Sequence, residues 1–342
     1  ALVAGQTVHD TLTVTSADGT TSRVIDVTVT GGNDVASISG SASGSVSEDV
    51  AVNGLGQLTA TGTLTVSDVD AGQAVLQTPV SLRGAYGDFT LDTSTGVWTY
   101  AANNSDSAIQ ALGVGQKLTD TLTVLSADGT ASQVITVTIN GSNDLPTLSG
   151  EVSGSVIEAS GVDNATAGTP SASGTVSISD ADAGQSSFQA PASLSGTYGD
   201  FTFNSATGVW GYELDNSKAA TQALVAGQTV HDTLTVTSAD GTTSRVIDVT
   251  VTGSNDAASI RGEVSGSVTE DAALTAGQLT ATGTLSVSDV DAGQAVFQAP
   301  ANLQGVYGDF TFNPTTGVWT YAANNSNPAI QALGATGQLT DT

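Results

Sequence analysis

Hydrophobic and polar residues alternate along most of this chain. Near its start, Leu12 and Val14 alternate with threonines, and Ile25 and Val27 alternate with polar residues beyond residues 16–19. Residues 16–19 read Ser-Ala-Asp-Gly, a run of residue types that favour turns. A period of two on both sides of a turn predicts an antiparallel hairpin with one buried face.

A longer repeat organises these local patterns. The motif Tyr-Gly-Asp-Phe, followed by Gly-Val-Trp, recurs three times and places the three tryptophans at Trp98, Trp210 and Trp319. They lie 112 and 109 residues apart, the length of a small all-β domain rather than of a solenoid turn. Residues 1–31 are identical to residues 223–253. We therefore expect the closing hairpin of a truncated repeat (1–34), two complete repeats (35–144 and 145–256) and a repeat without its closing hairpin (257–342).

Each complete repeat has the strand content of a β-sandwich. In the first, we expect strands at 45–48, 59–67 and near 74–82, further strands through Phe89 and Leu91 and through Trp98 and Tyr100, and a closing hairpin over 120–138. Ile109 and Leu112 are expected to anchor the connection before that hairpin. About seven strands in about 110 residues predict an immunoglobulin-type sandwich. The expected fold class is all-β, with β-sandwich domains in tandem.

The charge of the chain narrows its possible partners. The sequence carries 33 acidic and 6 basic residues, a formal net charge of -27. This charge argues against nucleic acid and anionic membrane surfaces as partners, and no apolar run approaches the ~18 residues of a membrane helix. The acidic side chains of a compact chain with this charge repel one another, and bound divalent cations would neutralise them. The sequence has no cysteine, which excludes disulfides and thiolate metal sites.

Several of the repeated stretches resemble a known family. They are residues 62–72, the Tyr-Gly-Asp-Phe and Gly-Val-Trp-Thr-Tyr motifs, residues 103–105, 110–112 and 120–124, and the Gly-Ser-Asn-Asp ending. Together they resemble VCBS repeats, which are cadherin-like domains in giant bacterial surface adhesins such as BapA-like biofilm-associated proteins and RTX adhesins. The resemblance implies an elongated extracellular rod, stiffened by calcium. The RTX nonapeptide itself is absent. Because the sequence starts at Ala1 and contains no methionine, we interpret it as a piece of a longer secreted protein.

Acidic residues recur at the positions where calcium would be expected. Calcium takes six to eight oxygen ligands, mostly carboxylates and carbonyls. In an immunoglobulin-type sandwich, the loop after the second strand and the turn of the closing hairpin lie at one end, whereas the end of the first strand lies at the other. Acids of neighbouring repeats are therefore predicted to meet at each junction, together with the linker Asn-Asp, much as in cadherins. The predicted ligands are Asp10, Asn33, Asp34, Asp68, Asp70 and Asp128 at the first junction; Glu48, Asp120, Asn143, Asp144, Asp180, Asp182 and Asp240 at the second; and Glu158, Asp232, Asn255, Asp256, Asp289 and Asp291 at the third.

Simpler interpretations exist for some of these residues. Asp18, Asp128 and Asp240 follow Ser-Ala and precede Gly, so turn chemistry alone accounts for them equally well. Trp98 and Tyr100 share one strand face, which is typical of a core pair and only secondarily of a sugar-stacking platform.

Nothing in the sequence favours an enzyme. The two histidines, His9 and His231, occupy the same repeat position, for which we expect a surface role at a strand edge. The chain has no third histidine and no nucleophile elbow, so a hydrolytic triad cannot be assembled.

The function expected from these observations is structural. We expect a calcium-stiffened spacer of a bacterial adhesin, at the cell surface or in the biofilm matrix, with neighbouring repeats and other copies of the adhesin as partners. The alternative is a repeated carbohydrate- or matrix-binding module that acts by avidity. Two interpretations of the incomplete ends also stay open. The sequence is a window cut from a longer array, or the opening hairpin of one chain completes the last domain of another by strand addition.

Overall fold

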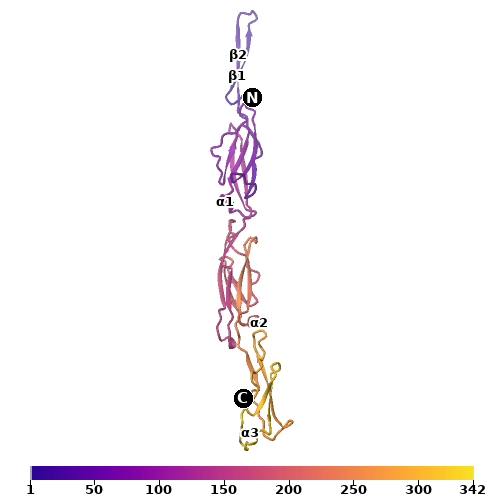
Figure 1. Ribbon diagram of the computed structural model, residues 1–342. Coiled ribbons are helices and arrows are strands. Elements are labelled where there is room, and N and C mark those ends of the chain that lie inside the picture. Colours follow the sequence, from indigo (N-terminus) through magenta and orange to yellow (C-terminus); the bar gives the residue numbers. More distant parts are fainter. Residues whose placement is uncertain (1) are drawn as a thin grey trace. The chain divides into compact units, whose positions relative to one another are not determined.

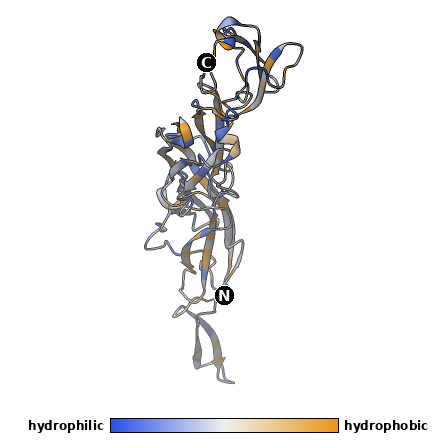
Figure 2. Ribbon diagram, turned by 90° about the horizontal axis from the view of Figure 1, so that it is seen from below, coloured by the Kyte–Doolittle hydropathy of each residue, from blue (hydrophilic) through white to orange (hydrophobic). Residues whose placement is uncertain are grey.

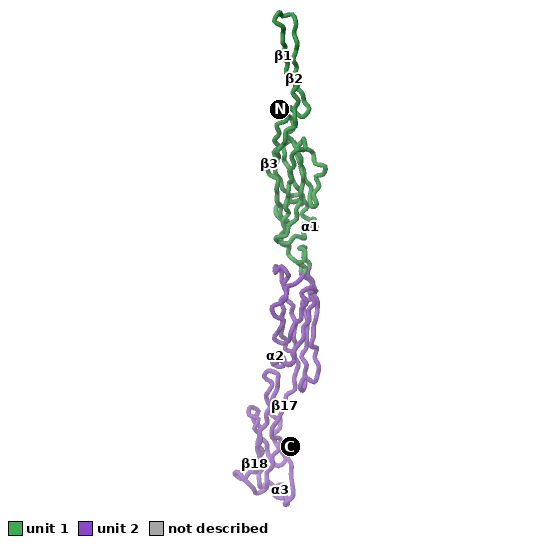
Figure 3. Tube along the Cα trace, turned by 180° about the vertical axis from the view of Figure 1, so that it is seen from behind, with its two compact units in different colours: residues 1–147, 179–186 green, residues 148–178, 187–342 purple. Residues whose placement is uncertain are grey.

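The computed structural model describes residues 2–342, which form β-strands joined by loops and very short helices (Figure 1). The expected all-β fold class is confirmed. The chain divides into two compact units, Ala1–Thr147 with Ser179–Ser186, and Leu148–Ile178 with Ser187–Thr342 (Figure 3). They are described in turn below.

The first unit begins with the hairpin that the alternation predicts. Strands β1 (Thr7–Thr15) and β2 (Ser22–Thr30) pair antiparallel, with Thr7 opposite Thr30 and Thr15 opposite Ser22. The turn is closed by the Ser16 amide, which donates to the Thr21 carbonyl at 2.8 Å, and Gly19 adopts a φ of 74° that a side chain would disfavour. The hairpin has the predicted pairing, but both of its faces are exposed.

The rest of the first unit contains a two-layered sandwich. One sheet has the strand order β3-β5-β7-β6, and the other has the order β4-β9-β8, in which β4 runs parallel to β9. Helix α1 (Ser107–Gln110) precedes the closing hairpin β8–β9 and, as predicted, Ile109 and Leu112 are buried there. The strands are β3 (Ser37–Gly40), β4 (Ser43–Ser47), β5 (Gln57–Ser67), β6 (Gly87–Leu91), β7 (Val97–Asn103), β8 (Lys117–Leu125) and β9 (Ser132–Asn140).

The aromatic residues of β6 and β7 lie in the core between the two sheets. Trp98 and Tyr100 have no exposed surface, and Phe89 packs on Tyr100 with 4.9 Å between the ring centroids. The indole of Trp98 donates to the Ser41 carbonyl at 2.7 Å, and a Cβ on Gly62 would lie 2.6 Å from the same indole. The interpretation of Trp98 and Tyr100 as a core pair is therefore confirmed.

One predicted strand is absent and one strand was not predicted. Residues 74–82 form no strand; only Leu76 bridges to Ser126, and the Gln77 amide donates to the Leu125 carbonyl at 2.8 Å. Pro79 has no amide hydrogen to continue that pairing, and Val80 is fully exposed. The seventh strand is instead β3, which pairs with β5.

The second unit contains a sandwich of the same topology. Its sheets have the orders β10-β12-β14-β13 and β11-β16-β15, and Trp210 and Tyr212 are buried between them. Its elements are β10 (Thr147–Gly150), β11 (Ser153–Ile157), the 3-10 helix η1 (Val162–Asn164), β12 (Ser171–Ser179), β13 (Gly199–Phe203), β14 (Val209–Leu214), α2 (Ala219–Gln222), β15 (Thr229–Thr237) and β16 (Ser244–Thr252).

Residues 257–342 of the second unit form one sheet only. Its order is β17-β18-β20-β19, which corresponds to the order of the four-stranded sheet in each of the two sandwiches. No second sheet covers it in the described part of the chain, so Trp319 is partly exposed where Trp98 and Trp210 are buried. Its elements are β17 (Ser259–Gly262), β18 (Gln278–Ser288), β19 (Gly308–Phe312), β20 (Val318–Asn324) and α3 (Pro328–Gln331).

Candidate metal centre

An Asp-x-Asp loop follows the long strand β5, and the linker that precedes the sandwich folds against it. The amide of linker residue Asp34 donates to Asp70 Oδ2 at 2.9 Å, and the Asp70 amide donates to Asp68 Oδ1 at 2.8 Å. The linker and the Asp-x-Asp loop are thus brought together, with their carboxylates in a small volume. We call Asn33, Asp34, Asp68 and Asp70 the first acidic cluster.

The same arrangement occurs twice more. In the second acidic cluster, the amide of Asp144 donates to Asp182 Oδ2 at 3.1 Å, and that of Asp182 to Asp180 Oδ1 at 3.0 Å. In the third, the corresponding bonds are Asp256 to Asp291 Oδ2 at 3.2 Å and Asp291 to Asp289 Oδ1 at 2.9 Å. With the linker residues Asn143 and Asn255, these groups repeat the first cluster. The structure therefore brings linker and Asp-x-Asp residues together in all three copies.

The second and third clusters each have a buried glutamate beside them. Glu48 directly follows β4 and is fully buried; it accepts hydrogen bonds from Gln110 Nε2 at 2.9 Å and from the Ser142 amide at 3.2 Å. Glu158 follows β11 and accepts from Gln222 Nε2 at 3.4 Å and from the Ser254 amide at 3.1 Å.

The surroundings of these glutamates disfavour their ionised form. Burial raises the pKa of Glu48 to about 7, and the neighbouring carboxylate of Asp144 adds to this. Burial likewise raises the pKa of Glu158 to about 7, with Asp256 and Asp291 contributing. The pKa values of Asp144, Asp256 and Asp291 are also raised, chiefly by burial and then by the other carboxylates. Negative charge is thus concentrated where water is scarce.

Several carboxylate oxygens in the clusters are buried and accept no hydrogen bond. The residues Asp70, Asp256 and Asp291 are at most 4% exposed, and no arginine or lysine of the described residues pairs with them. A buried carboxylate without a partner is strongly unfavourable, and a hard cation bound by oxygen would compensate for it. The residues therefore fit calcium. The atoms are Asp68 Oδ2, Asp70 Oδ1, Asp144 Oδ2, Asp180 Oδ2, both carboxylate oxygens of Asp256, and Asp291 Oδ1.

The carboxylates alone do not form a finished metal site. Among residues 2–342, no three His, Cys, Asp or Glu side chains already converge as a ligand set. Calcium sites also use backbone carbonyls, amide side chains and water. The linker residues Asn33, Asn143 and Asn255 are candidates for such ligands, because each side chain lies at the carbonyl of the following aspartate, at 2.6–2.8 Å.

Three predicted ligands lie elsewhere. The Asp120 carboxylate is buried inside the first sandwich, where it accepts from the amides of Ala85, Tyr86 and Gly87 and from the Tyr100 hydroxyl at 2.6–3.0 Å. Asp232 makes the equivalent four bonds in the second sandwich, and Asp10, its counterpart on β1, is exposed. Asp120 and Asp232 hold the 84–87 and 196–199 loops, and we do not include them or Asp10 in the metal sites proposed below.

The hairpin-turn aspartates make the bonds expected from turn chemistry. Asp128 accepts from Ser126 Oγ at 2.6 Å, from Thr130 and from Asn33 Nδ2, and these bonds lower its pKa in that order. Asp240 accepts from Ser238 Oγ and Thr242 in the same turn of the second sandwich. Asp128 is thus both a turn residue and a neighbour of the first cluster, and for Asp240 a metal role stays a prediction.

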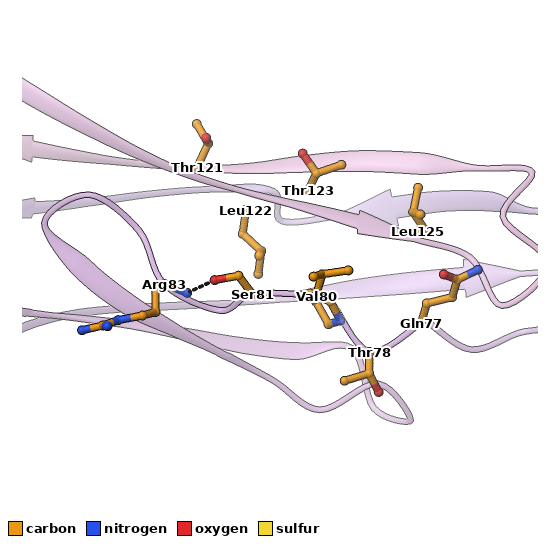
Figure 4. A pocket seen from close by; sticks show the side chains of 10 residues that line it. Gln77, Thr78, Val80, Ser81, Arg83, Thr121, Leu122, Thr123 and Leu125 are labelled. Atoms are coloured by element: carbon orange, nitrogen blue, oxygen red, sulfur yellow. Dashed lines mark hydrogen bonds between the residues drawn. The ribbon is translucent and has the colours of Figure 1, made fainter.

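A groove of about 360 Å³ lies between the 77–83 loop and β8, apart from the acidic clusters (Figure 4). It is lined by Pro79, Val80, Leu122 and Leu125 among others, and Arg83 is the one ionisable side chain among its described lining residues. General acid–base chemistry has no pair of groups to use there.

Both histidines lie on hairpins. His9 Nδ1 lies 2.9 Å from Asp26 Oδ1, and His231 Nδ1 lies 2.7 Å from Asp248 Oδ1; about half of each side chain is exposed. These pairs have the surface position expected from the sequence. In residues 2–342, no helix has the length and apolar character needed to span a membrane.

No protein-family model matches the chain, and no curated protein matches it. Solved cadherin tandems are similar in structure. "PcdhgB3 EC1-4" is 14% identical over 96% of this chain and 77% of its own, with a TM-score of 0.38. Protocadherin Gamma B7 domains 1-4 are 12% identical over 92% and 74%, with a TM-score of 0.35, and Drosophila N-cadherin EC1-4 is 14% identical over 96% and 77%, with a TM-score of 0.26. These scores are too low for any property of those proteins to be transferred, so the fold rests on the chain's own sheet topology.

Proposed function

We propose that this chain belongs to the extracellular spacer of a large repetitive bacterial adhesin, in which calcium ions stiffen the array of sandwiches. Such a spacer would hold an adhesive segment away from the cell and support attachment and biofilm formation. Its partners would be neighbouring repeats of the same protein and other copies of it. The repeat units would be those expected from the sequence, 35–144 and 145–256, with partial units on either side.

The observation that carries this proposal is the set of buried, unpartnered carboxylate oxygens, repeated at three equivalent places. Asp70 and Asp291 are each 2% exposed and have an oxygen without a donor. An enzyme would need such groups in a cleft, whereas here they lie where a linker meets an Asp-x-Asp loop. A role in joining consecutive domains accounts for that position.

Calcium would supply the missing positive charge. In the third cluster, Asp256, Asp289, Asp291 and Glu158 would hold it, with Asn255 as a further oxygen donor. Without the cation, these carboxylates repel one another and loosen the linker. With it, the linker amide bonds to Asp182 and Asp291 are retained and the linker has fewer conformations.

The test is calorimetric titration of calcium into the full chain. We expect saturable binding with more than one ion per chain, and a rise in the melting temperature that a chelator reverses. The double variant Asp289→Asn, Asp291→Asn should lose the ions of the third cluster only. Asp309→Asn, at an exposed position on β19, is the matched control. The absence of any binding at millimolar calcium would exclude the proposal.

The carbohydrate-binding alternative receives no support from the tryptophans of the two complete sandwiches. Trp98 and Trp210 are at most 1% exposed, so neither offers a face on which a sugar ring could stack. We therefore do not develop that alternative.

A further inference from the structure

The sequence contains two Asn-Gly pairs, Asn53-Gly54 and Asn140-Gly141, and both lie in the first unit. The backbone nitrogen that follows an asparagine can attack its side-chain amide, and glycine hinders this attack least because it has no Cβ. The attack closes a five-membered succinimide ring and releases ammonia, and water then opens the ring to aspartate or isoaspartate. Whether a given pair reacts therefore depends on how the fold holds the side-chain amide and the attacking nitrogen.

The loop between β4 and β5 holds the side-chain oxygen of Asn53 between two backbone donors. The Leu55 amide donates to Asn53 Oδ1 at 2.9 Å, and the Gln57 amide donates to the same oxygen at 3.0 Å. The backbone of Asn53 is also fixed, because its amide donates to the Gln57 carbonyl and its carbonyl accepts from the Gly56 amide. Negative charge develops on Oδ1 when the Cγ carbon is attacked, so two amides aimed at this oxygen form an oxyanion hole.

The attacking nitrogen of this pair is free. Gly54 is exposed, and its amide donates to no acceptor among the described residues. A Cβ on Gly54 would meet no atom within 4 Å, so solvent reaches the amide. This nitrogen must lose its proton as it attacks, and here no structural hydrogen bond has to break first.

The second pair is held in the opposite way. Asn140 ends β9, one of the strands in which hydrophobic and hydrophilic residues alternate (Figure 2). The Gly141 amide donates to the Gln116 carbonyl at 3.0 Å, and Asn140 Nδ2 donates to the Val46 carbonyl at 3.0 Å. Within residues 2–342, no group donates to Asn140 Oδ1. Attack at this pair would break two hydrogen bonds and find no donor for the oxyanion.

We propose that the fold promotes the conversion of Asn53 to aspartate and isoaspartate, and that it protects Asn140 from the same reaction. Gly54 N bonds to Asn53 Cγ and loses its proton to hydroxide, and Nδ2 leaves as ammonia after taking a proton from water. One water molecule then adds to either carbonyl of the ring. The net change is one water consumed and one ammonia released, with no oxidant or further co-reactant.

The product adds one negative charge to a loop that is already acidic. Glu48 and Asp49 begin this loop, and Asn104 connects its two ends, since Asn104 Oδ1 accepts from the Asp49 amide and the Asn104 amide donates to the Gly56 carbonyl, both at 3.0 Å. Isoaspartate would also lengthen the main chain of the turn by one carbon. The later repeats have no Asn-Gly pair in this loop, so the modification is specific to the first complete repeat.

The test compares the two pairs within one protein, folded and unfolded. The full chain is kept at pH 8 in buffer and in guanidinium chloride, and peptide mapping by mass spectrometry follows the conversion at each asparagine. In guanidinium chloride the two pairs should react at similar rates, because only the local sequence acts there. In the folded protein, Asn53 should react about tenfold faster than in the unfolded chain, and Asn140 about tenfold slower or less. A folded-state rate at Asn53 equal to or below its unfolded-state rate would overturn the proposal.

Two variants at Gln57 test the donor directly. Gln57→Pro removes the amide that donates to Asn53 Oδ1, at the first position of β5, where proline is tolerated. The folded-state conversion of Asn53 should then slow by about threefold or more. Gln57→Ala is the matched control, because it keeps the amide, and it should leave the rate unchanged. Equal rates in the two folded variants would contradict the assignment of the oxyanion hole. If circular dichroism shows that Gln57→Pro does not fold, the comparison of the folded and unfolded chain decides alone.

Discussion

Residues 1–31 and 223–253 have one sequence and two environments. In both places the strands have the same length and register, from Thr7 opposite Thr30 to its equivalent, Thr229 opposite Thr252. Ile25 is 51% exposed, whereas Ile247 is completely buried. Alternation and turn chemistry thus specify the hairpin, and burial is supplied by what the hairpin meets.

Comparing the two hairpins separates the contribution of local sequence to strand pairing from the contribution of tertiary contacts to stability. Local propensity gives the pairing, because the turn is closed by its own residues in each copy: Ser16 bonds to Thr21, and Ser238 to Thr243, both at 2.8 Å. The stability that depends on tertiary contacts should then appear only in the covered copy. This tertiary contribution can be measured by making the same substitution at equivalent positions of the two hairpins, whose local sequences are identical.

The largest difference is expected for a charge placed in the core. Ile247→Asp should destabilise the second sandwich by about 4 kcal/mol or more, because an unpaired carboxylate would be buried. Ile25→Asp should change the unfolding free energy of that sandwich by less than about 0.5 kcal/mol, since Ile25 is exposed. Urea unfolding measures both, followed by fluorescence in a background in which Trp98 and Trp319 are replaced by phenylalanine, so that Trp210 alone reports on the second sandwich. Similar losses in the two variants would contradict the comparison.

The next largest difference concerns the buried aspartate. Asp232→Ala removes the acceptor of three amides and of the Tyr212 hydroxyl, so we expect a loss of about 3 kcal/mol in unfolding free energy. The same change at Asp10 should have no measurable effect on the second sandwich, because Asp10 is exposed on β1. The same fluorescence assay measures both variants. An unchanged unfolding free energy in Asp232→Ala would show that these hydrogen bonds contribute little to stability.

A somewhat smaller effect is expected from pH. Burial raises the pKa of Glu158 to about 7 in the folded state, from an ordinary value of 4.5, so the folded state keeps a proton that the unfolded state releases. In chelator, the unfolding free energy should therefore fall as pH rises from about 4.5 to 7, by roughly 2–3 kcal/mol for this residue. Calcium should reverse the loss at pH 8 and do little at pH 4.5.

Two matched variants test whether Glu158 causes that pH dependence. Glu158→Gln should flatten the pH profile of the melting temperature in chelator. Glu270→Gln, at the equivalent but partly exposed position beyond β17, should leave it unchanged. A profile that is flat in the unmodified chain would show that the glutamate is not held protonated.

The smallest effect should be equal in the two hairpins. His9 and His231 each lie beside an aspartate on a half-exposed surface. Exposed pairs of this kind contribute ~0–1 kcal/mol, so His9→Ala and His231→Ala should each lower stability by no more than that. Hydrogen exchange of the two hairpins measures both. A large loss of stability in His231→Ala alone would mean that the His231–Asp248 pair depends on the packing of the covered hairpin.

Much of the fold could be predicted because the strands are half-buried and amphipathic. The closing hairpins, the core position of Trp98 and the anchoring roles of Ile109 and Leu112 all follow from alternation and repeat spacing. Residues 74–82 misled the prediction, since their apolar content suggested a strand that Pro79 prevents. Strand β3 was missed because four residues carry too little periodicity to be detected.

The candidate site could be predicted only in part. The linker and Asp-x-Asp residues meet as the repeat topology implies, but Asp120 does not join them. The sequence shows that a residue is acidic, but it does not show which backbone amides will donate to its carboxylate. The glutamine partners of Glu48 and Glu158 were also missed as site residues. Gln110 and Gln222 recur at one repeat position, which was the available signal.

The most direct test of the calcium proposal is small-angle X-ray scattering of the full chain. Curves are recorded in millimolar calcium and in chelator at pH 8. We predict a stiff, extended particle in calcium and a more flexible one, with a broader distribution of dimensions, in chelator. Superimposable curves in the two buffers, with calcium binding verified by titration, would contradict the claim that the cation stiffens the array.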